Sequence, residues 1–175
     1  VTFPEVWRTV LRTYDELGPK GTPAAEIAGV TLEALPEVGR YYFRGQQANL
    51  PVEAGHPWHD AWARFEAEHG SLGPAITRLL TADPWDKGIL PAIAKLLSRY
   101  GTRLTTASFL AGLDWMPEDL KDVIAIHTLN AGVGPEQTLA LYASMAAVMA
   151  SDGVWVPRGG VYEIAAGLEK LALEA

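Results

Sequence analysis

The segment Gly153-Val154-Trp155-Val156-Pro157-Arg158-Gly159-Gly160 decides the fold, because it joins a short strand to the last helix of the chain. Val154–Val156 is rich in β-branched and aromatic residues, which favours a strand. The glycine pair permits positive φ or close backbone approach. Residues 161–175 have the apolar spacing of an amphipathic helix. Its predicted apolar face consists of Val161, Ile164, Ala165, Leu168, Leu171 and Ala172.

The late strand needs partners, and the early part of the chain supplies three candidates. Val30–Leu35 alternates apolar and polar residues, and Val38–Arg44 is rich in aromatic residues, so both favour strands. Ala48–Val52 follows a turn and is predicted to return antiparallel, as an edge strand because it contains Pro51. Val154–Val156 is expected to join this early sheet.

Helices account for most of the remaining chain. Thr2 and Glu5 have the spacing of a capping box before the first helix, which ends at Gly18. Later helices are predicted over residues 58–70, 74–82, 86–100, 106–113, from Pro117 onward and over Pro135–Ala150. The last of these is nearly all apolar, which implies burial or an apolar partner. The predicted fold class is α+β, mostly helical with a small mixed or antiparallel sheet, in a single domain over 1–175.

Composition excludes several classes of function. The chain has 175 residues with a formal net charge of −7, so it is not expected to bind nucleic acid. It contains no cysteine, which excludes disulfides, thiolate zinc sites and thiol nucleophiles. The longest apolar stretch, Leu139–Ala150, is shorter than the ~20 residues of a spanning helix. A cytoplasmic chain is expected, with peripheral membrane contact of the intact protein left open.

No self-contained catalytic set emerges from the motifs. No serine lies in a nucleophile-elbow context, and neither a G-x-G-x-x-G nor a G-x-x-x-x-G-K phosphate loop is present. His127 lies on an apolar helix face, which favours a core role. His56, His59 and His69 suggest a metal-dependent hydrolase as one alternative, but they lack the full spacing of a metal-binding motif.

The terminal segment resembles a recurring segment of the carotenoid (phytoene) desaturases, in the flavin-dependent, amine-oxidase-like superfamily. The shared pattern is an aromatic and apolar strand, proline, a variable residue, two glycines and an amphipathic helix, here Gly153–Val161 followed by Leu168–Glu174. Leu129–Tyr142 resembles the family's glycine-proline loop before an apolar helix. Val1–Val6 is similar to its entry into the substrate domain, whereas the similarity between Ala54 and Leu113 is loose.

The resemblance implies that this chain is a substrate domain inserted into a Rossmann-like FAD domain that lies outside it. It implies hydride transfer from an apolar, carotenoid or isoprenoid substrate to FAD, so the chain alone is expected to be inactive. The implied cofactor-binding residues are Pro157, Arg158, Gly159 and Gly160. The implied substrate-binding residues are Phe109, Trp115, Tyr142, Met145 and Met149. Core packing is the competing interpretation for each of them. A helical protein-interaction domain remains the other alternative.

Overall fold

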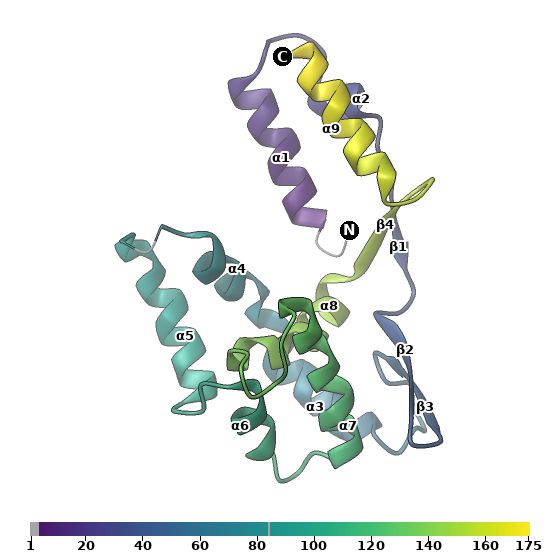
Figure 1. Cartoon of the computed structure of the whole chain (residues 1–175), viewed down its shortest axis with the longest axis vertical. Helices are drawn as coiled ribbons and strands as arrows, with labels where there is room; N and C mark the ends of the chain where they lie inside the picture. Colours follow the sequence, from purple (N-terminus) through teal and green to yellow (C-terminus); the bar gives the residue numbers. More distant parts are fainter. Residues whose placement is uncertain (1–3, 84) are drawn as a thin grey trace. The chain divides into compact units, whose positions relative to one another are not determined.

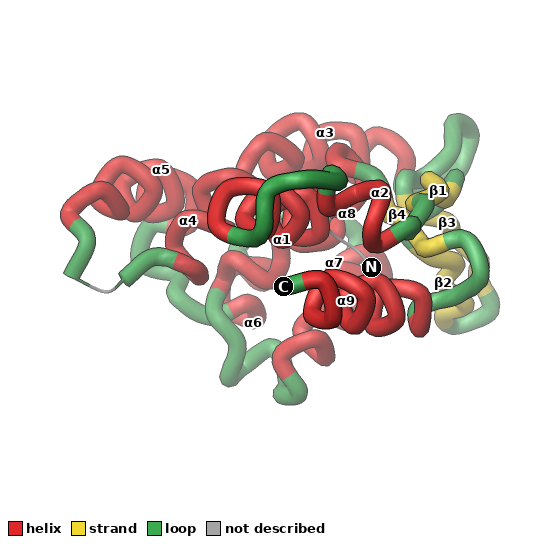
Figure 2. The backbone as a smooth tube through the Cα atoms, turned by 90° about the horizontal axis from the view of Figure 1, so that it is seen from above, coloured by secondary structure: helices red, strands yellow, loops and turns green. Residues whose placement is uncertain are grey.

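The computed structural model describes residues 4–83 and 85–175, which form two compact units (Figures 1 and 2). Unit 1 combines the residues up to Pro36 with Gly153–Ala175, and unit 2 is Glu37–Asp152. Most of the secondary structure is helical and the strands form two small antiparallel pairs, which confirms the predicted α+β class. Thr2 of the predicted capping box lies outside the described residues.

Unit 1 is built around the pairing of an early and a late strand. Leu32 lies opposite Pro157 and Leu35 opposite Val154 in an antiparallel pair, which confirms that the late strand joins an early one. The elements of unit 1 are α1 (Pro4–Leu17), α2 (Ala24–Ala28), β1 (Leu32–Leu35), β4 (Val154–Pro157) and α9 (Tyr162–Glu174).

The core of unit 1 lies where α2 packs against both α1 and α9. Trp7, Ala24, Ala28 and Leu171 are its buried residues. Gly167 in α9 explains the close packing: a Cβ there would lie 2.7 Å from a methyl carbon of Val30. A glycine inside a helix costs about 1 kcal/mol relative to alanine, and here the close approach requires it.

Unit 2 contains a β-hairpin followed by helices. Its elements are β2 (Gly39–Phe43), β3 (Gln46–Leu50), α3 (His59–His69), η1 (Gly70–Leu72), α4 (Gly73–Thr81), η2 (Lys87–Ile89), α5 (Leu90–Tyr100), α6 (Thr106–Ala111), α7 (Glu118–Ala125), η3 (Ile126–Ala131), η4 (Ala140–Ser144) and α8 (Met145–Asp152). β2 pairs with β3 alone, so the strands form two ribbons rather than one sheet. Arg44 and Gly45 both have positive φ, as the tight hairpin turn requires.

The predicted helix over Pro135–Ala150 is wrong in its first half. The α-helix begins only at Met145, after a turn and the 3₁₀ segment η4. Leu139 is extended instead, and it forms a β-bridge with Thr105. The Ala140 amide donates to the Leu104 carbonyl at 2.8 Å, so long-range backbone pairing replaces the local helical bonds. Pro135 also lacks an N–H group for a helical ladder.

Most apolar side chains of this segment are buried within unit 2 itself, although Leu139 is 54% exposed. The buried residues are Thr138, Ala140, Leu141, Ala143, Ser144, Ala146, Ala147, Val148 and Met149. They therefore form part of a core and leave little apolar surface for a partner in this segment, and the interaction-domain alternative stays a prediction. No helix in the described part of the chain is long and apolar enough to cross a bilayer.

Candidate functional site

The turn between β4 and α9 is the part of the resemblance that the structure describes in most detail. The Arg158 amide donates to the Thr31 carbonyl at 2.8 Å and extends the pairing of β1 and β4. The Gly160 amide then donates back to the Pro157 carbonyl at 3.0 Å. Gly159 and Gly160 have φ of +93° and +107°, which confirms the expected positive φ. A side chain at either position would be strained.

The two glycines differ in their surroundings. A Cβ on Gly159 would lie 3.2 Å from the Glu163 side chain, whereas a Cβ on Gly160 would meet no described atom within 4 Å. The described residues would therefore leave room for a side chain at position 160, and packing alone does not require glycine there. Val161 and Tyr162, which follow directly, are large apolar residues and are exposed. The backbone at Gly160 is thus open to a group from outside, beside an apolar surface.

Arg158 places a cation next to this turn. Its Nε donates to the Glu33 carboxylate on β1 at 2.6 Å, and both side chains remain largely exposed to solvent. An exposed ion pair contributes about 0–1 kcal/mol, so an anionic ligand could replace Glu33 as the partner of Arg158 at little cost.

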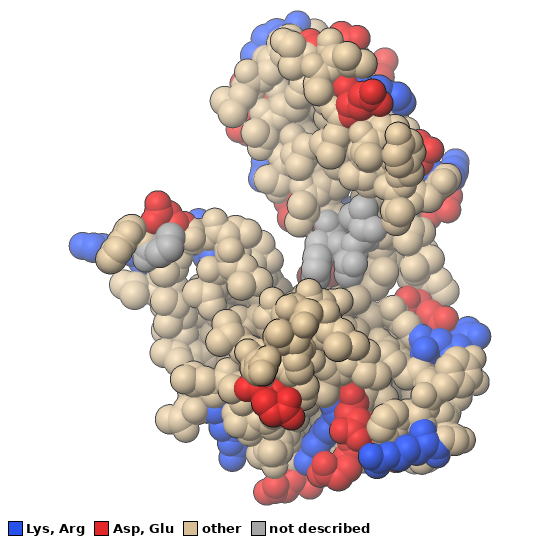
Figure 3. Space-filling model, in the orientation of Figure 1, with Lys and Arg blue, Asp and Glu red and all other residues tan. Residues whose placement is uncertain are grey.

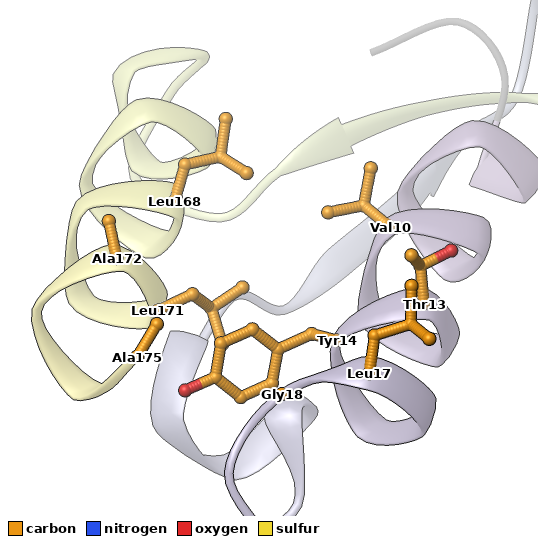
Figure 4. A pocket seen from close by; sticks show the side chains of 9 residues that line it. All are labelled: Val10, Thr13, Tyr14, Leu17, Gly18, Leu168, Leu171, Ala172 and Ala175. Carbon is orange, nitrogen blue, oxygen red and sulfur yellow. The ribbon is translucent and has the colours of Figure 1, made fainter.

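An apolar groove lies between α1 and α9 of the same unit (Figure 4). Its volume is about 400 Å³, within the range of small-molecule sites, and it is open to solvent. Apart from Thr13 and the aromatic ring and hydroxyl of Tyr14, its side chains are aliphatic. The residues that line it are Val10, Thr13, Tyr14, Leu17, Gly18, Leu168, Leu171, Ala172 and Ala175.

Tyr14 is the unusual residue of this groove. Its side chain extends from α1 toward α9 (Figure 4), and its hydroxyl oxygen is buried without a hydrogen-bond partner among the described residues. A buried hydroxyl without a partner costs about 1–3 kcal/mol. Sequence reasoning missed the groove, although Val10, Leu168 and Leu171 have the helical spacing that would suggest apolar faces.

The five residues implied as substrate-binding all lie in unit 2. Phe109 is buried in α6, and Met149 is buried in α8. Trp115, Tyr142 and Met145 are half-buried. None of the five lines the groove of unit 1. None of them lines the shallow hollow at the β2–β3 turn (Tyr42–Gln47) either. A substrate role for the five therefore stays a prediction.

Two of these five have well-defined packing partners. The ring of Phe109 lies edge-on to Tyr100, with 5.1 Å between centroids, and to His69 at 5.4 Å. The Arg64 guanidinium lies over the Trp115 ring, 4.1 Å from its centroid. Phe109 is thus a core residue of an aromatic cluster, and Trp115 is shielded on one face.

That cluster encloses a serine–histidine contact. His69 Nδ1 and the Tyr100 hydroxyl each lie 2.6 Å from Ser144 Oγ, and His69 stacks on Phe65. Burial lowers the pKa of His69 to about 4, and Arg99 adds to the shift. Burial also raises the pKa of Tyr100 to about 12. Since His69 and Ser144 are almost completely buried, the contact has no access for a substrate and is structural.

The three histidines of the hydrolase alternative do not form a metal-binding group. His56 Nδ1 accepts from the Trp58 amide, and His59 Nδ1 contacts the Val52 carbonyl. His69 is occupied in the core by Ser144. Within residues 4–83 and 85–175, no cluster of three His, Cys, Asp or Glu side chains could hold a metal ion. His127, predicted to be a core residue, is buried and pairs with the Tyr41 hydroxyl at 2.9 Å.

Comparison with known proteins adds no relative: no family model, no curated protein and no solved structure matches the chain.

Proposed function

We propose that the chain is the substrate domain of an FAD-dependent oxidoreductase that acts on an apolar substrate of the carotenoid or isoprenoid class. The open approach to the backbone at Gly160 carries this proposal, because no described atom lies within 4 Å of the Cβ position of that residue. The turn fits a bound cofactor, since a Cβ would fill the space through which a ligand approaches.

The residues of the turn have distinct roles in this proposal. Gly160 would allow the cofactor to approach the backbone, Gly159 would permit the turn, and Arg158 would provide a positive charge for the pyrophosphate of the cofactor. FAD accepts the hydride when it is bound. The exposed side chains of Val161 and Tyr162 would provide an apolar surface beside the bound cofactor.

The apolar groove supports the substrate class. Its aliphatic lining, with two hydroxyls, provides few groups that could orient a charged metabolite. An apolar chain would bury the exposed surfaces of Leu17 and Leu168. Each buried methylene of such a ligand contributes about 0.8 kcal/mol.

A glycine variant tests the proposal in the protein expressed from its complete reading frame. Gly160→Ala is expected to lower FAD content and turnover, measured by flavin absorbance and substrate oxidation. Gly132→Ala is the matched control, because Gly132 also has positive φ, at 74°, with no described atom within 4 Å of its Cβ position. Equal flavin content in both variants would contradict the proposal, and so would a reading frame without a G-x-G-x-x-G segment.

A further inference from the structure

We draw no further inference here: the strongest candidate, the exposed apolar face of the α4–α5 hairpin (Figure 3), which includes Leu80, Trp85, Leu90 and Leu97, carries none because nothing in the structure shows what covers it.

Discussion

His69 Nδ1 and Ser144 Oγ lie 2.6 Å apart in the core of unit 2, and this contact joins α3 to η4. The Tyr100 hydroxyl reaches the same serine oxygen from α5, also at 2.6 Å. One hydroxyl thus satisfies two buried polar groups from two other helices. Because Phe65 and Phe109 enclose the ring of His69, solvent has no access through which to replace Ser144. The link fixes the positions of three elements.

Mild acid is expected to destabilise unit 2 through His69. Burial lowers its pKa in the folded state from 6.5 to about 4, so the unfolded chain binds the proton first as pH falls. Stability is therefore complete above pH 6.5 and is lost progressively between pH 6.5 and 4. The maximum loss is roughly 3 kcal/mol. Urea unfolding at several pH values across this window measures it.

His69→Gln is the control for this pH dependence. The variant is less stable at neutral pH, but it should lose less of its remaining stability on acidification than the unmodified chain. His127 contributes with the same sign, because burial lowers its pKa too. A residual pH dependence is therefore expected, and identical slopes for the variant and the unmodified chain would contradict the assignment to His69.

Removal of the shared hydroxyl is expected to be costly. Ser144→Ala leaves His69 Nδ1 and the Tyr100 hydroxyl buried without partners, and each such group costs about 1–3 kcal/mol. Ser98→Ala provides the matched control, because the Ser98 hydroxyl is exposed and donates to the Lys95 carbonyl of its own helix. Denaturant unfolding should show a large loss for Ser144→Ala and a change within about 0.5 kcal/mol for Ser98→Ala. Similar losses would show that the buried link is energetically unimportant.

Two leucines on α9, one buried and one exposed, provide a matched test of the core packing in unit 1. Leu171 is 4% exposed and packs in the core with Trp7, whereas Leu173 is 81% exposed. Leu171→Ala is expected to destabilise unit 1 by about 2–5 kcal/mol, because it leaves a cavity. Leu173→Ala should change stability by less than about 0.5 kcal/mol. Hydrogen exchange of the α9 amides measures both, and equal protection in the two variants would contradict the observed face of the helix.

The fold class and most strand positions can be predicted from the sequence because they depend on local patterns. Apolar–polar alternation indicates β1, and β-branched and aromatic runs indicate β2 and β4. The pairing of the late strand with an early one is confirmed. The predicted helix over Pro135–Ala150 is wrong in its first half because the structure there depends on a long-range contact. The apolar run from Leu139 to Ala150 is typical of a buried helix, but Leu139 pairs with Thr105, a contact between residues distant in the sequence.

The candidate site, too, is predictable from the sequence only where it depends on local residue type. The residue type permits the positive φ of Gly159 and Gly160, because glycine adopts such backbone angles without the strain that a Cβ would cause. The groove cannot be predicted in the same way, because α1 and α9 lie at opposite ends of the sequence. Helical spacing indicates that each has an apolar face, but it gives no information on which faces lie opposite each other.

Substitution of Tyr14 distinguishes an empty groove from a ligand site. The Tyr14 hydroxyl is buried and has no partner within residues 4–83 and 85–175, so Tyr14→Phe should raise the stability of unit 1 by roughly 1 kcal/mol.

Ala172→Phe instead fills the groove, and it is expected to reduce binding of the apolar dye ANS severalfold, measured by fluorescence titration. Leu173→Phe is the control, because it adds a ring to the same helix at a position that does not line the groove. If the two phenylalanine variants of α9 bind the dye equally, the groove is not the apolar binding site of this unit.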